Sequence, residues 1–479
     1  MKWAVVLPLF LAAQTALAAP PDDDKKREDD IFGGGEEPKA VEPPAPSTSD
    51  YGDERMGAGE AKENTELLYK DKSQIGGFLY MRGSANYNQG SKFSDIGLGN
   101  SNLFDAYFDT RLNDRVRAMV RGRILYNPLV NPQTTGISSS SALGAAPSND
   151  TVKALLTQMW LKFDVKRVVF VTVGQQFVRW GTTRFWNPVD VLNTTKVNPL
   201  AFFDERVGIP MLKLHVPIEK YGWNLYGIVL SDSASTIDRL GAAVRAEALF
   251  GHTELGISSI FRKNVDPKIG LDVSSGLGDF DFTAEFGLVF QQGFANPGYS
   301  PQWQLAAGVS WTWPYREDDS LILGVEYFHN DQGLTLPGVY NATKQSVLDQ
   351  VAAGVTIPTL PTFTPLYTSR DYIGAVATVT SPGSMNDANI TAISLTNLTD
   401  GSGTVQLNFS DLILTDLTVE TYVGASYGDG ELRGNLPYFQ AHLPNEPAYP
   451  LVQNNPLVQG LMAAHAPLLR AGLNLRVNL

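Results

Sequence analysis

The last fourteen residues, 466–479, alternate between an apolar row and a mostly polar row of side chains. The apolar row is Leu469, Ala471, Leu473, Leu475, Val477 and Leu479, and the other row is Leu468, Arg470, Gly472, Asn474, Arg476 and Asn478. A period of two residues indicates a β-strand with one apolar and one polar face. An antiparallel sheet in a water-soluble protein gives the same alternation. The strand therefore restricts the fold only when it is read together with the rest of the chain.

The amino-terminal end has the pattern of an export signal. Met1 and Lys2 precede a mostly apolar stretch that ends in Ala16-Leu17-Ala18, and Ala19 follows. A positive start, a short apolar core and small residues before the cut predict a signal peptide over 1–18. The alternative is an amino-terminal membrane helix, but the stretch is shorter than the ~20 apolar residues that such a helix needs. We therefore expect the mature chain to begin at Ala19.

Residues 19–74 have a different composition. They are rich in charged residues and proline, as in D-D-D-K-K-R-E-D-D and E-P-P-A-P-S-T-S-D, and carry too little apolar surface to fold alone. We expect a disordered acidic and proline-rich tail in the periplasm. The whole chain has a net charge of −13, which argues against nucleic-acid binding. It contains no cysteine, which excludes disulfides, a lipid-modified cysteine and cysteine–zinc sites.

From residue 75 to residue 479 the chain consists of short alternating segments separated by turn residues. In one of them Phe280, Phe282, Ala284 and Phe286 alternate with Asp279, Asp281, Thr283 and Glu285. We predict eighteen strands: 76–87, 103–112, 115–126, 152–164, 168–177, 209–217, 222–230, 240–250, 252–262, 268–274, 279–290, 303–313, 320–329, 367–379, 389–397, 404–413, 417–427 and 467–479. The patterns at 389–397 and 404–413 are the weakest, so sixteen strands is the main alternative.

The connections between these segments alternate in length. Those after even-numbered segments are short, as at 113–114 and 166–167, whereas 127–151, 178–208, 231–239, 330–366 and 428–466 are long. Short turns on one rim and long loops on the other are typical of a transmembrane β-barrel of the bacterial outer membrane. Lipid offers no hydrogen-bond partners, so a spanning sheet has to close. An even number of strands places both chain ends on the short-turn, periplasmic rim.

A secreted β-sandwich or β-helix also has many short strands. The apolar faces in this chain, however, carry aromatic residues near both strand ends: Trp303, Trp311, Trp313, Tyr327 and Tyr427. Aromatic residues at both interfaces are a property of membrane barrels. No fixed-period repeat indicates a propeller or a solenoid. The sequence therefore favours a single all-β, antiparallel transmembrane barrel.

The chain resembles the porin-like barrels of Gram-negative outer membranes. The similar parts are the closing strand, the segment G-Q-Q-F-V-R-W-G-T-T-R-F-W-N-P-V-D-V-L-N over 174–193, and the hairpin L-T-N-L-T-D-G-S-G-T-V-Q-L-N-F-S-D-L over 395–412. The segment 174–193 is similar to a G-x-Q…W-G…N-P-x-D-x-x-N segment of uncharacterised porin-like families. The resemblance implies an outer-membrane location, contact with membrane lipid, and insertion by the barrel-assembly machinery. It departs from the pattern at Leu479, where phenylalanine is usual.

Arginines dominate one face of the third predicted strand. Arg115, Arg117, Arg121 and Arg123 lie opposite an apolar row that should face lipid, where a charge near the midplane costs ~2–4 kcal/mol. We therefore expect the arginines to line the pore, near Arg470 and Arg476 of the last strand and across from Asp281 and Glu285. One interpretation is a field across the pore that selects solutes. The other is a set of interstrand ion pairs that only braces the wall.

The long loop 178–208 is too apolar for an ordinary surface loop. Phe185, Val189 and Leu192 need burial, so we predict that the loop folds into the barrel and narrows it. The alternative is a loop packed on the rim. The residues proposed for the constriction are Trp180, Arg184, Trp186, Asp190 and Asn193.

Little in the sequence indicates catalysis. None of the five histidines has metal-ligand spacing, and no P-loop, G-x-S-x-G or HExxH motif is present. The one cluster that merits inspection is His252 with Glu254 and Ser258. We expect no enzymatic activity, no metal and no cofactor.

The sequence predicts a porin for the passive or substrate-biased diffusion of small polar solutes, with anions as one candidate class. A barrel that sheathes a protein partner and a transporter of hydrophobic compounds remain as alternatives. A receptor with a folded plug would need a larger and less polar domain than residues 19–74 provide. The solute and the oligomeric state, a trimer included, are left open.

Overall fold

The computed structural model describes residues 73–129, 151–193, 195–232, 234–263, 265–290, 301–316, 319–353 and 363–479. All of them belong to the unit Ser49–Leu479. The predicted export signal and the tail up to residue 72 lie outside the described residues. The first strand begins at Ser73, two residues ahead of the predicted boundary, so Ser73 and Gln74 are part of the barrel.

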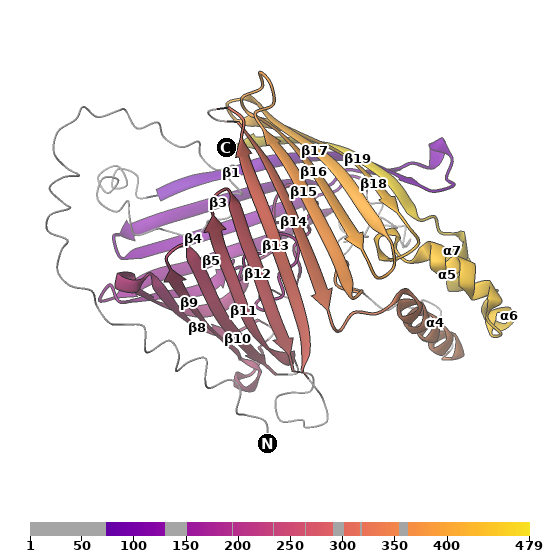
Figure 1. Ribbon diagram of the computed structural model, residues 1–479, viewed down its shortest axis with the longest axis horizontal. Coiled ribbons are helices and arrows are strands. Elements are labelled where there is room, and N and C mark those ends of the chain that lie inside the picture. The colour runs from indigo at the N-terminus through magenta and orange to yellow at the C-terminus, as the bar shows by residue number, and fades with distance from the viewer. Residues whose placement is uncertain are drawn as a thin grey trace. The chain divides into compact units, whose positions relative to one another are not determined.

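The described chain folds into one antiparallel sheet (Figure 1). It has nineteen strands, of which β2 (Gly97–Gly99) has three residues and pairs only with β1, which leaves eighteen long strands. These are β1 (Ser73–Asn88), β3 (Asn102–Asn113), β4 (Val116–Tyr126), β5 (Val152–Val165), β6 (Val169–Gln176), β7 (Ile209–Ile218), β8 (Trp223–Leu230), β9 (Gly241–Phe250), β10 (Thr253–Arg262), β11 (Val265–Leu277), β12 (Phe280–Val289), β13 (Gln302–Pro314), β14 (Ser320–Asn330), β15 (Asp371–Thr380), β16 (Ala388–Asn397), β17 (Gly403–Leu414), β18 (Leu417–Tyr427) and β19 (Pro467–Asn478). The prediction of eighteen strands is confirmed, and both weak segments are strands, β16 and β17.

The sheet closes into a barrel because β1 pairs with β19. Their antiparallel register runs from Phe78 opposite Asn478 to Tyr87 opposite Leu469. The main-chain N–H of Leu479 donates to the carbonyl of Gly77 at 2.9 Å. With this pair formed, the sheet has no open edge along its length.

The apolar row of each strand points away from the barrel interior. In β19, Leu469 and Leu473 are exposed, whereas Asn474 is buried. The same alternation leaves an outer belt of exposed apolar side chains, which includes Leu79, Met81, Phe104, Phe108, Val120, Ile124, Leu156, Leu161, Val173, Leu214, Leu225, Val229, Val244, Leu255, Ile257, Leu271, Phe282, Val309, Val325, Val405, Leu407, Val423, Leu469 and Leu473. A belt of this size on a closed barrel is the surface that a bilayer covers.

Aromatic side chains lie on the outer face near both rims. Towards the short-turn rim, Trp311 stacks on Trp313 with ring centroids 6.2 Å apart. Towards the other rim, Trp303 stacks on His329 at 4.2 Å, and His329 pairs with Asp371. These two bands match the aromatic girdles of membrane barrels. Among the described residues, no helix has the length and apolar character needed to cross a membrane.

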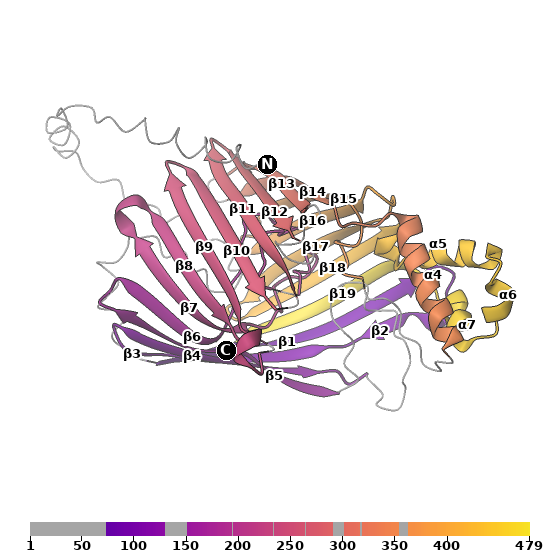
Figure 2. The ribbon, with the colours of Figure 1, turned by 90° about the horizontal axis from the view of Figure 1, so that it is seen from below.

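The long connections carry helices, which lie beyond the same end of the strands in Figures 1 and 2. The helices are α4 (Leu336–Ala352), α5 (Leu436–His442), α6 (Tyr449–Val452) and α7 (Pro456–Ala463). The 3-10 turns among the described residues are η2 (Phe93–Asp95), η3 (Glu219–Tyr221) in the short turn between β7 and β8, η4 (Ile237–Arg239), η5 (Glu431–Arg433) and η6 (Leu443–Asn445). Tyr340 and Val347 of α4 pack against Phe439 and Val458 from the connection 428–466. Glu446 joins the two connections, since it accepts hydrogen bonds from Lys344 and Tyr340 at 2.8 Å each.

A buried carboxylate fastens the connection 428–466 to the barrel. Glu431 accepts hydrogen bonds from the main-chain N–H of Leu366 at 2.6 Å, the hydroxyl of Tyr372 at 2.6 Å and the side-chain amide of Asn397 at 2.9 Å. Asp400 lies beside it and accepts the main-chain N–H of Glu431 at 2.8 Å. Burial raises the pKa of Glu431 from 4.5 to about 7, and the charge of Asp400 adds to this increase.

This raised pKa predicts a pH-dependent connection. A carboxyl whose folded pKa lies above its unfolded value stabilises the folded state fully below about pH 4.5, and this contribution is lost as the pH rises through about 7. Relative to its cleavage of an unfolded substrate at the same pH, chymotrypsin should therefore cut within 428–466 faster at about pH 8 than at about pH 5.5. Glu431→Gln should remove the pH dependence, whereas Glu446→Gln should retain it. A pH dependence that persists in Glu431→Gln would assign the effect to another group.

Candidate functional site

The connection 177–208, called here the inward loop, packs against the interior wall of the barrel. Trp186 is fully buried, stacks on Phe328 of β14 at 5.7 Å between ring centroids, and donates its indole N–H to the carbonyl of Leu366 at 2.9 Å. Val189 and Leu192 are also fully buried, in a second apolar cluster with residues of β7 to β10. These contacts hold the loop against the interior wall of the barrel rather than on its rim.

Glycines on the wall make room for the loop. A Cβ at Gly374 of β15 would lie 2.5 Å from the ring of Phe185, and one at Gly270 of β11 would lie 3.0 Å from Val189. Gly181, within the loop, has a φ of +99°, and a Cβ there would collide with the carboxylate of Glu285. At each of these close approaches one partner is a glycine, which leaves room for the side chain of the other.

The second half of the loop contacts β17 and β1, near the closing pair. The carbonyl of Leu200 accepts the side-chain amide of Gln406 on β17 at 2.9 Å. Phe203 packs edge-on against Tyr80 of β1 at 5.2 Å, and Glu205 pairs with Arg82 at 2.6 Å. The loop therefore touches the wall from β7 through β15 to β1, which narrows the interior.

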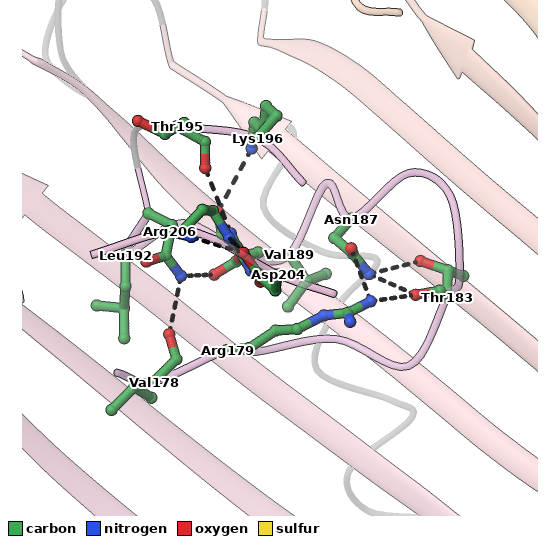
Figure 3. Close-up of polar contacts among 12 residues, drawn as sticks. Val178, Arg179, Thr183, Asn187, Val189, Leu192, Thr195, Lys196, Asp204 and Arg206 are labelled. Carbon is green, nitrogen blue, oxygen red and sulfur yellow. Dashed lines mark hydrogen bonds and ion pairs between the residues drawn. The ribbon is translucent and has the colours of Figure 1, made fainter. Parts of the chain in front are cut away.

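Hydrogen bonds within the loop hold its two halves together (Figure 3). Arg206 pairs with Asp190 at 2.9 Å, and Asn193 donates to Asp190 at 2.7 Å. In the first half, Arg179 donates to the carbonyl of Thr183 at 2.8 Å and to the side chain of Asn187 at 3.0 Å. Figure 3 shows these three side chains gathered on one turn, apart from the cluster around Arg206.

The predicted constriction residues fall into two groups. Trp180, Trp186, Asp190 and Asn193 are 0 to 6% exposed, so they form the body of the loop. Arg184 is exposed, and so is Arg179, the other arginine in this part of the chain. The apolar character of the loop indicated that it is buried, but gave no sign of which side chains remain in contact with water.

The arginines predicted to line the pore are mostly paired. Arg121 and Arg123 share Asp105 of β3, and Arg117 pairs with Asp109. Arg123 also donates to the carbonyl of Glu205 in the loop at 2.7 Å. These contacts correspond to the second sequence interpretation, in which interstrand ion pairs brace the wall.

Arg115 departs from the predicted row. It lies in the turn before β4, where its guanidinium pairs with Asp164 at 3.0 Å. Arg115 therefore belongs to the short-turn rim rather than to the pore-facing part of β4.

The other predicted pore residues lie on the inner face. Arg470 donates to the hydroxyl of Thr404 at 3.0 Å, and Arg476 lies on the same side of β19. Their strand is three places from β4 in the sheet order. Asp281 and Glu285 are on β12, eight places from β4 among eighteen strands, which is nearly across the barrel. Asp281 is exposed, whereas Glu285 is buried beneath the inward loop.

The candidate catalytic cluster does not assemble. His252 lies in the turn before β10, and Ser258 lies six residues further along the chain, about 20 Å away along an extended strand. The Ser258 side chain is 1% exposed. Within the described part of the chain, no group of three or more His, Asp or Glu side chains is placed to hold a metal ion.

No model of a known protein family matches the chain, and no curated protein matches it. Among the solved structures that align with 85% of this chain, two have a TM-score of 0.50. One is OccAB3 of Acinetobacter baumannii, with 10% sequence identity over 99% of that chain and a TM-score of 0.50. The other is a BenF-like porin from Pseudomonas fluorescens Pf-5, also with 10% identity over 99% of that chain and a TM-score of 0.50. The chain therefore has the fold of the outer-membrane porin-like barrels, as its sequence resemblance predicts.

The packing of Trp186 predicts how firmly the loop is held. Trp186→Ala should weaken the docking of the loop by about 3–5 kcal/mol, the usual cost of removing a buried tryptophan. Chymotrypsin should then cut within 180–198 faster than in the parent protein. Trp313→Ala removes the same side chain from the outer face, where it is 51% exposed, and should leave this cleavage unchanged. Equal cleavage in both variants would show that Trp186 does not hold the loop.

Proposed function

We propose that the protein is a bacterial outer-membrane channel for small polar solutes, with a preference for anions. The observation that carries this proposal is the pair of exposed arginines on the inward loop, Arg179 and Arg184. Among the described residues, no carboxylate lies within ion-pair distance of either guanidinium. In a narrow water-filled passage, fixed positive charges attract anions and repel cations.

The paired arginines on β4 support the proposal in a different way. Asp105 and Asp109 offset much of the charge of Arg117, Arg121 and Arg123. Their row therefore contributes a weaker electric field to the passage than three unpaired arginines would. We assign selectivity mainly to the loop arginines and give the β4 row the task of bracing the wall and the end of the loop.

The two alternative functions have less support. A transporter of hydrophobic compounds would need apolar side chains along its passage, but Trp186, Val189 and Leu192 of the loop are fully buried. A barrel that sheathes a protein partner would need an open interior, whereas the inward loop touches the wall from β7 through β15 to β1. We propose that the short-turn rim faces the periplasm and that membrane lipid, small solutes and the assembly machinery are the partners.

The selectivity is tested in planar bilayers. The double variant Arg179→Ala/Arg184→Ala should shift the anion-to-cation permeability ratio towards cations by about fivefold, the effect of losing ~1 kcal/mol of charge interaction in a watery site. Arg167→Ala removes an arginine from the short-turn rim and should leave the ratio unchanged. An unchanged ratio in the double variant, with the loop still docked, would overturn the assignment to these arginines.

The transport activity itself is tested by liposome swelling. Purified protein should admit small organic acids faster than neutral sugars of similar size, because the passage is narrow and positively charged. Hydrophobic compounds serve as a third class of solute. Failure of all three classes to enter would contradict a channel and favour the sheath.

A further inference from the structure

The turn at 182–189 of the inward loop has an unusual set of main-chain hydrogen bonds. It contains seven N–H groups, because Pro188 has none. Thr182, Thr183 and Val189 donate theirs to Glu285 on β12 at 2.7, 2.8 and 3.0 Å. All seven find their acceptor on a side chain outside the loop, and three of them share this one carboxylate.

Glu326 on β14 accepts the next three N–H groups. Arg184, Phe185 and Trp186 donate to it at 2.8, 3.1 and 2.8 Å. The remaining N–H, that of Asn187, donates to the hydroxyl of Tyr367 at 3.1 Å. Both carboxylates are nearly inaccessible, with Glu285 1% and Glu326 3% exposed.

This arrangement makes the turn dependent on the wall. A buried N–H without an acceptor is unfavourable, so a segment whose N–H groups point outward cannot keep its shape alone. A buried carboxylate likewise needs several donors to replace its water. The turn and the two carboxylates therefore satisfy each other, and neither partner is stable in this environment without the other.

We propose that Glu285 and Glu326 are positioning residues that hold the inward loop in the barrel and thereby set the width of the passage. The inference rests on the proposed channel function, since width has a functional meaning only in a channel. Neither residue touches the solute, because both lie beneath the loop. They act through the loop and its exposed arginines.

The variants Glu326→Gln and Glu285→Gln test this assignment. Glutamine has the same shape, but one of its two terminal groups is a donor and cannot accept an N–H. In Glu326→Gln at least one of the N–H groups of Arg184, Phe185 and Trp186 loses its acceptor. Glu420→Gln is the matched control: it alters a buried carboxylate on β18 that accepts the hydroxyl of Tyr80 and makes no hydrogen bond to the loop.

The position of the loop is read with a single thiol. The chain has no cysteine, so Val189→Cys creates one reactive site at a fully buried position of the loop. A maleimide reagent should label the Val189→Cys protein at least about tenfold faster when Glu326→Gln or Glu285→Gln is also present than when neither is. This ratio corresponds to ~1.4 kcal/mol of lost protection. Labelling in the Glu420→Gln background should equal that of Val189→Cys alone. Glu326→Asp, which keeps the charge, should restore part of the protection.

Single-channel conductance is measured on the same proteins without the thiol. Both glutamine variants should conduct about twofold more than the parent protein, since the passage widens when the loop is released. Faster labelling with unchanged conductance would overturn the claim about width. Unchanged labelling and unchanged conductance in folded variants would overturn the positioning role.

These outcomes separate the two proposals. If the parent protein passes no solute and the glutamine variants label faster, the proposed function fails and the positioning role stands. If the parent protein conducts and neither glutamine variant differs from it, the proposed function stands and the positioning role fails. Should one variant fail to fold, as judged by heat-dependent migration in gels, the other still tests the role, because each carboxylate holds its own part of the turn.

Discussion

Every main-chain polar group of this barrel has to find its partner within the protein, because the lipid around the outer belt supplies none. The pairing of β1 with β19 meets this requirement for the strands. The same requirement applies inside, where the inward loop is buried against the wall. There the turn at 182–189 has no strand neighbour, and two carboxylates replace it as acceptors. Closure of the wall and placement of the loop therefore both depend on finding hydrogen-bond partners for the main chain within the protein.

The strands were predictable because the environment of each residue changes with a period of two. Lipid lies on one side and the interior on the other, so the alternation survives even in β16 and β17, whose patterns are weak. The bounds of the tail depended on composition alone, which changes gradually, and the prediction missed Ser73 and Gln74 there.

The site was predictable only in part. The apolar composition of the inward loop indicated burial, but burial against a particular wall depends on contacts far apart in the sequence. Trp186 and Phe328 are an example, since the residues that meet are on different elements. Glu285 was assigned to the pore lining, yet it lies beneath the loop. An acidic residue facing inward on a strand is compatible with both roles. The ion pairs of Arg121 and Arg123 with Asp105, by contrast, follow from adjacent strands whose charges alternate in register.

The wall glycines have a consequence for how this protein can diverge. The ring of Phe185 occupies the space that a side chain at Gly374 would need, although the two residues are far apart in the sequence. A mutation that adds a single methyl group at Gly374 would therefore displace Phe185 without changing any residue of the loop. The position of the inward loop therefore depends on residues of the strands as well as on the sequence of the loop itself.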